Sequence, residues 1–188
     1  MSVPLPSAGA AGTEFARMVH DGWADAATRA GIDLTGLDPA APLAERIAWA
    51  RSVGLDVATV YARCNQRYPQ SIADQVRECT VFAAGNRMYV PHDLVSIDEG
   101  VSRHRGGLAR LRAILDGRHA TVLLASRLSR LYRQSQASYA FIEEMVVRKG
   151  LRAISVRDAL DTANTAMWQM LLMARVAWRD VFRRHRGR

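Results

Sequence analysis

The sequence has few of the residues that stabilise secreted or metal-binding domains. Among 188 residues there are two cysteines, Cys64 and Cys79, and five scattered histidines. The cysteines lack the spacing of a metal site and are predicted to be free thiols, and we expect neither a metal nor another cofactor. No apolar run has transmembrane length, and no basic segment followed by an apolar one opens the chain. We therefore predict a soluble protein of a reducing cytoplasm, with no membrane partner.

The chain also has very little lysine. Lys149 is the only one, although lysine and arginine together number 26 and the net charge is +8. Residues 1–55 carry four arginines against six acidic residues, a net charge of −2, so the remainder carries +10. Because arginine binds phosphate through a planar fork of donors, a nucleic-acid partner is predicted. A GC-rich genome would also explain an excess of arginine, but it does not explain this uneven distribution.

The size of the chain favours one domain with an appendage. A chain of 188 residues that is 49% hydrophobic can bury one good core. We expect an N-terminal helical appendage over residues 1–55, in which residues 1–12 are disordered and helices span 14–30 and 43–53. Residues 56–188 would form the main domain. The appendage could cap that domain, bind a partner or lead into the first strand.

The stretch from Val57 to Gln75 organises the rest of the chain. Residues 57–62 are apolar on both faces of a strand, as in the central strands of covered sheets. Ser71 and Asp74 form a capping-box pattern, so a helix is predicted to begin at Ser71. Between them lies a polar loop, at the place where open α/β sheets bind ligands.

Further elements are predicted from the same patterns. Pro91 breaks an extended segment into two strand pieces. The predicted elements are strand pieces at 88–90 and 94–97, a short helix ending near Gly117, a strand at 121–125, a helix at 135–148, a last strand at 151–156 and a helix at 165–188.

Three motifs resemble the catalytic domain of serine recombinases, the resolvase/invertase family. They are Tyr61-x-Arg63 followed by Ser71-Ile72-x-Asp74-Gln75, then DEGVS with RGGL at 98–108, and SRLSRLYR at 126–133. The resemblance covers residues 56 to about 182. It implies an α/β fold with a central four- to five-stranded, mostly parallel sheet flanked by helices, and a long C-terminal helix.

The resemblance also implies a phosphate site. By that resemblance Arg130 and Arg133 hold the scissile phosphate, Ser129 supports them, and Arg63 and Arg105 lie at the active site. Preplaced guanidinium groups stabilise the charge that develops during phosphoryl transfer on DNA. Further candidate DNA contacts are Arg127, Arg183, Arg184 and Arg186.

Asn65 occupies the position of the family's nucleophilic serine. A carboxamide cannot become an alkoxide, so it cannot form the covalent intermediate with DNA. Cys64 would point to the opposite face of the strand. Three functions follow as alternatives: a cleavage-defective relative that binds DNA or regulates an intact recombinase, an active enzyme with another nucleophile, or an oligomerisation module with no DNA role.

The predicted last helix has an apolar stripe wider than one core needs. Its apolar residues between Met167 and Val181 recur at spacings of three and four. We therefore expect a homodimer or higher oligomer through this helix. A deeply buried helix is the alternative.

Overall fold

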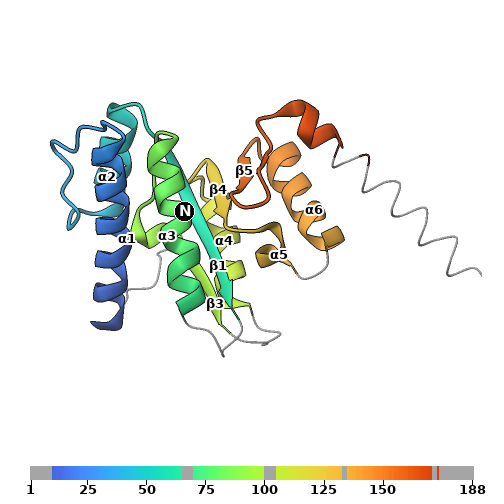
Figure 1. Cartoon of the computed structure of the whole chain (residues 1–188), viewed down its shortest axis with the longest axis horizontal. Coiled ribbons are helices and arrows are strands. Elements are labelled where there is room, and N and C mark those ends of the chain that lie inside the picture. Colours follow the sequence, from blue (N-terminus) through green and yellow to red (C-terminus); the bar gives the residue numbers. More distant parts are fainter. Residues whose placement is uncertain (1–9, 65–69, 100–104, 133–134, 171–172, 174–188) are drawn as a thin grey trace, which may run out of the picture.

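The computed structural model describes residues 10–64, 70–99, 105–132, 135–170 and 173. It is an α/β fold in which helices cover both faces of a mostly parallel sheet (Figure 1). The strands are β1 Asp56–Cys64, β2 Met88–Tyr89, β3 Val95–Glu99, β4 Val122–Ala125, β5 Arg152–Ser155 and β6 Leu160–Asp161. The helices are α1 Ala10–Arg29, α2 Leu43–Ser52, α3 Gln70–Gly85, η1 His92–Leu94, α4 Gly106–Asp116, α5 Leu128–Leu131, α6 Ser135–Glu143 and the π-helical turn η2 Glu144–Arg148.

The sheet is built around β1. On one side β1 pairs first with β2 and then with β3, and on the other side it pairs with β4. The order continues through β5 to β6, and among the strand pairs of the described residues only β5–β6 is antiparallel. The short helix η1 separates β2 from β3 directly after Pro91. The strand interrupted at this proline and the mostly parallel sheet are both confirmed.

Strand β1 is buried on both faces, as predicted. Only Asp56 and Arg63 of its nine residues are not buried. One apolar core, with Trp23, Val60 and Val76, lies between the sheet and helices α1 to α3. The other, with Tyr61 and Phe141, lies between the sheet and helices α4 to α6. Apolar side chains on both faces fix β1 as the centre of the fold.

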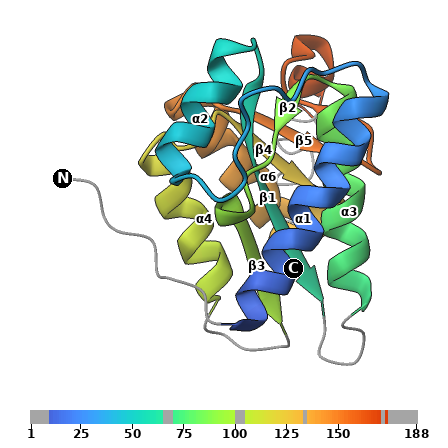
Figure 2. The same ribbon diagram turned by 90° about the vertical axis from the view of Figure 1, so that its left-hand side faces the viewer.

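The N-terminal helices pack closely on the rest of the protein. Figure 2 shows α1 beside α3, and the two helices are in contact. The indole Nε1 of Trp23 donates to the carbonyl oxygen of Met88 in β2 at 2.7 Å. Trp23, Trp49 and Tyr89 form mutual edge-to-face ring contacts, with centroids 4.8–6.3 Å apart. Residues 10–29 and 43–52 are helical, so α1 includes residues 10–12, which were expected to be disordered.

Several boundaries differ from the sequence expectation by a few residues, and the sheet has six strands where four or five were expected. Helix α3 begins at Gln70, one residue before Ser71. Strand β5 is not the last strand, because β6 follows it. Strand β6 has two residues, which is too short for an alternating hydrophobic pattern that the sequence could show. Side-chain hydrogen bonds hold β6 in place in addition to its backbone pairing with β5. Arg152 donates two of them to the carboxylate of Asp161, at 2.9 and 2.6 Å, and the amide of Ala153 donates to the hydroxyl of Thr162.

The beginning of the expected last helix is described. Residues 165–170 are helical, and Trp168 is buried in the second core. Met170 and Met173 are 70% and 73% exposed. The remainder of the expected helix lies outside the described residues. Within the described part of the chain, no helix is long and apolar enough to cross a membrane.

Candidate active site

Three of the predicted arginines meet at the carboxyl ends of β1 and β4. Arg63 is the penultimate residue of β1, Arg105 immediately precedes α4, and Arg130 lies on α5, which follows β4. Because β1, β3 and β4 are parallel, their carboxyl ends lie at one edge of the sheet, where α/β folds bind ligands.

A buried carboxylate anchors this edge. Asp98, in β3, is 8% exposed and accepts hydrogen bonds from the Tyr61 hydroxyl at 2.7 Å and from the amides of Gly107 and Leu108 at 2.8 and 3.1 Å. Burial, with the hydrogen bond to Asp98 as the next cause, raises the pKa of the Tyr61 phenol far above its usual value. The phenol therefore stays protonated and remains a donor to Asp98.

The guanidinium of Arg105 joins three elements. Its Nη2 donates to the Tyr61 hydroxyl at 2.7 Å, to the carbonyl of Leu131, and more weakly to that of Arg130 at 3.4 Å. Its Nε lies 3.7 Å from a carboxylate oxygen of Asp98. These contacts tie β1 and β3 to α5, so Arg105 fixes the backbone that carries Arg130.

Arg130 reaches the end of β1. Its Nη1 donates to the backbone carbonyl of Arg63 at 3.3 Å, and its buried Nε has no hydrogen-bond partner among the described residues. The side chain of Gln75, on α3, accepts from the amide of Arg63 and donates to its carbonyl, both at 3.1 Å. The backbone at Arg63 is therefore held from both sides, and a donor of Arg130 is left unused.

The other candidates differ in their positions. Arg127 is half-exposed and lies 3.5 Å from the carboxylate of Asp158. Ser129 is exposed on α5 beside Arg130. The remaining candidates lie outside the described residues: Asn65, Arg133, Arg183, Arg184 and Arg186.

Cys64 does not have the properties of an activated thiol. It is 5% exposed, and its side chain belongs to the core beneath α1 to α3. Burial, and then the neighbouring Glu99, raises the pKa of the thiol. A reactive cysteine needs the opposite shift and an accessible sulfur.

Asp98 and Gln75 are functional residues that the sequence does not single out, although both lie within the quoted motifs. A carboxylate near the end of a buried strand was the available signal for Asp98, since buried carboxylates need several donors. Nothing in the sequence indicates the role of Gln75, because its hydrogen bonds to the backbone of Arg63 depend on how α3 packs against β1.

The main domain is similar to a known family and to two solved structures. The family model described as Resolvase, N terminal domain, matches residues 58–185. The structure of the N-terminal catalytic domain of TP901-1 integrase is 21% identical, with a TM-score of 0.59 over 68% of this chain and 97% of that one. The C-terminal catalytic domain of ISC1926 TnpA, an IS607-like serine recombinase, is 25% identical over 53% of this chain and 70% of that one, with a TM-score of 0.47. A search of curated proteins gave no match.

The likeness to the integrase domain shows a shared fold. The family match shows more, because it spans well over half of the chain and includes most of β1, the residues bonded to Asp98, and α5. The chain therefore belongs to the resolvase N-terminal domain family, that of the serine-recombinase catalytic domains.

Proposed function

We propose that this catalytic domain binds a DNA backbone phosphate through its arginines and does not cleave the strand. The observation that carries the proposal is the position of Arg63, Arg105 and Arg130 at one edge of the sheet, where Arg105 donates to the backbone carbonyl of Arg130 and Arg130 donates to that of Arg63. Asp98 offsets the charge of Arg105. Within the described residues no acidic side chain forms an ion pair with Arg63 or Arg130, so their charges are available to attract an anion.

The absence of cleavage rests on the residue type at position 65. Asn65 stands where the family's serine attacks DNA, and a carboxamide cannot form the phosphoester. Cys64, the adjacent nucleophile type, is buried with a raised pKa, which argues against its replacing the serine.

A covalent-adduct assay tests the chemistry. The protein is incubated with nicked or supercoiled DNA and run on a denaturing gel, and we expect no shifted protein band. Asn65→Ser is the matched variant, and an adduct that forms only with it would indicate that the rest of the site is intact. A DNA-dependent band with the parent protein would contradict the proposal, and mapping the adduct to Cys64, Ser71 or Ser129 would support an active enzyme instead.

Salt-dependent binding tests the phosphate site. We expect weak binding to duplex DNA with little sequence preference, at a Kd of roughly 10⁻⁴ to 10⁻⁶ M at physiological salt. Arg130→Ala should weaken binding and flatten the slope of log affinity against log salt by about one unit. Arg51→Ala, which removes the same charge from an exposed position on α2, is the control. Equal binding by Arg130→Ala and the parent at every salt concentration would refute the site, and the tail arginines would become the contact to test.

Self-association is a second function that one observation favours. Met170 and Met173 are exposed beside the buried Trp168. A contiguous exposed apolar surface marks an interaction site, and these two methionines would belong to it. A cleavage-defective subunit could pair through this surface with its own kind or with an intact recombinase, and so regulate it.

Light scattering tests the association. We expect the parent to be larger than a monomer at tens of micromolar, and Met170→Glu to dissociate it because an unpaired charge would be buried. Gln169→Glu, at the exposed neighbouring position, is the control for added charge. A monomeric parent would rule out this surface as a self-association site.

A further inference from the structure

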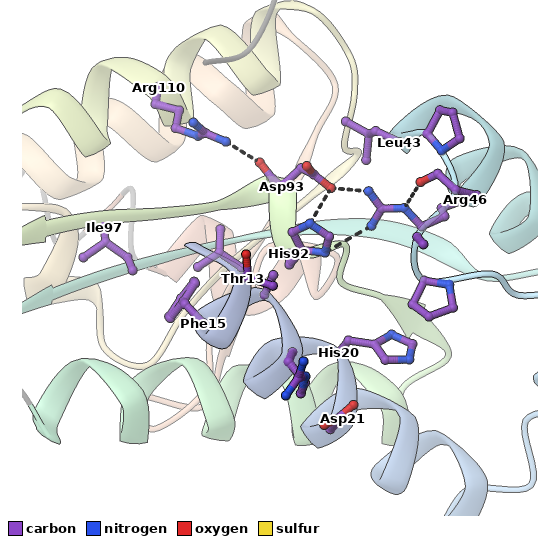
Figure 3. Close-up of a pocket in the computed structure, with 17 residues that line it drawn as sticks. Thr13, Phe15, His20, Asp21, Leu43, Arg46, His92, Asp93, Ile97 and Arg110 are labelled. Carbon is purple, nitrogen blue, oxygen red and sulfur yellow. Dashed lines mark hydrogen bonds and ion pairs between the residues drawn. The ribbon is translucent and has the colours of Figure 1, made fainter. Parts of the chain in front are cut away.

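A groove of about 1050 Å³ opens where the N-terminal helices meet the sheet. Figure 3 shows its walls, which come from α1, the start of α2, η1, β3 and α4. The resolvase match begins at residue 58, so α1 and α2 lie outside it. Arg63, Arg105 and Arg130 do not line the groove, which is therefore a different place from the proposed phosphate site.

The floor of the groove is a fixed polar cluster. Arg46 is 4% exposed, donates to the carbonyl of Ala41 at 2.8 Å, and forms an ion pair with the carboxylate of Asp93. Its Nη1 lies 3.3 Å from the ring Nδ1 of His92. Arg46 thus neutralises Asp93, and the floor presents no uncompensated negative charge.

An arginine lies on the wall opposite α1. The Nη2 of Arg110, on α4, donates to the backbone carbonyl of Asp93 at 2.8 Å. Its Nε is buried and has no hydrogen-bond partner among the described residues. The side chain of Arg110 lines the groove and is held by its bond to Asp93, so its positive charge is fixed where an anionic group can bind.

The charge of the groove favours an anion. Three arginines and two aspartates line it, which gives a net charge of +1 with the histidines neutral. Burial is the first cause that lowers the pKa of both His20 and His92, so both rings are mainly uncharged at neutral pH. An uncharged ring can still donate one hydrogen bond to an anion.

Apolar side chains line another part of the groove. Phe15, Leu43 and Ile97 are partly buried and line it on three sides, from α1, α2 and β3. A concave, largely apolar surface with a few converging polar groups is typical of pockets for small organic molecules, whose volumes are about 300–1,000 Å³.

We propose that this groove binds a small organic anion. Its carboxylate or phosphate group lies against Arg110, and its apolar body lies between Phe15 and Ile97. Because the walls come from α1, α2, η1 and α4, the bound anion holds the first 55 residues against the catalytic domain. Binding therefore stabilises the fold at the junction of the two parts.

Three small probes test the proposal. Benzoate, phenyl phosphate and the uncharged benzyl alcohol are titrated into the full chain, and binding is followed by amide chemical shifts and by the thermal midpoint. We expect at least one anion to shift the amides of η1 and α4 and to raise the midpoint, and benzyl alcohol to bind about tenfold more weakly or not at all. Comparison of benzoate with phenyl phosphate identifies the anionic group.

Variants of the groove complete the test. Arg110→Gln should weaken anion binding about tenfold, because one charged hydrogen bond is lost. Leu43→Glu is an independent variant that places a carboxylate on the wall of the groove and should abolish anion binding by repulsion. Arg51→Gln removes a charge on α2 outside the groove and should bind as the parent does. The proposal is overturned if neither anion shifts these amides at millimolar concentration, if benzyl alcohol binds equally well, or if Leu43→Glu binds like the parent.

Discussion

Replacement of Asp98 by asparagine tests whether the carboxylate at the edge of the sheet organises the arginine cluster. The two oxygens of Asp98 accept three buried hydrogen bonds, from Tyr61 and from the amides of Gly107 and Leu108. Asparagine has nearly the same shape but only one oxygen. In either orientation of the carboxamide, its NH₂ group meets at least one backbone N–H that it cannot satisfy.

The expected loss of stability is large. One unpaired buried donor costs about 1–3 kcal/mol. The Nε of Arg105, 3.7 Å from the carboxylate, also loses its counter-charge. Breaking a fully buried ion pair costs about 3–5 kcal/mol, but this longer pair should contribute less. We therefore expect the free energy of unfolding to fall by about 3 kcal/mol, within the roughly 5–15 kcal/mol of a typical domain.

Urea unfolding followed by tryptophan fluorescence measures this change. Glu99→Gln, at the exposed next position of β3, is the control and should change stability by less than about 0.5 kcal/mol. Tyr61→Phe combined with Asp98→Asn completes a double-mutant cycle, in which a coupling of about 1 kcal/mol or more is expected for residues that share a hydrogen bond. A loss below about 0.5 kcal/mol for Asp98→Asn, or simple additivity in the cycle, would refute the view that Asp98 holds this edge together.

Two further predictions concern packing and pH. Gly107→Ala should lower the free energy of unfolding in urea by at least about 2 kcal/mol, because a Cβ at this position would overlap the carbonyl oxygen of Ile97. Gly106→Ala is the control: its Cβ would meet open space, so this change should be neutral or stabilising. Equal effects of the two changes would contradict this. Stability should fall as the pH drops below about 6.5, because the folded protein lowers the pKa of His20 and His92, so the unfolded chain binds protons more readily. The charged groups that influence the pKa values of His20 and His92 are Asp21, Arg46 and Asp93. The double variant His20→Gln/His92→Gln should have a flatter pH profile, and an unchanged profile would count against this cause.

The sequence predicted the elements that depend on local pattern. The apolar run of β1 and the break at Pro91 are visible in the residues themselves, and both appear in the structure. Those two predictions needed only a short stretch and the patterns of strand formation. The expectation that Arg130 lies near Arg63 came from the resemblance of their motifs to the serine-recombinase family, and Arg130 donates to the carbonyl of Arg63.

Other features depend on contacts that no local pattern encodes. Arg46 and Asp93 are 47 residues apart, and nothing in either segment indicates that they pair. The groove likewise exists only because α1 packs across α3 and leaves space above β3. For Arg105 the motif predicted the position, while its hydrogen bonds to two backbone carbonyls could not be predicted, because they depend on the path of α5.

The hydrogen bond from Trp23 to Met88 has a consequence for aggregation. Strand β2 is at the edge of the sheet, and an open edge is a template for pairing with another chain. The indole occupies a carbonyl of that edge, and the rings of Trp23 and Trp49 pack against Tyr89 beside it. We therefore expect a chain without its first 55 residues to present a bare strand and an exposed aromatic surface, and to form insoluble assemblies instead of an isolated catalytic domain.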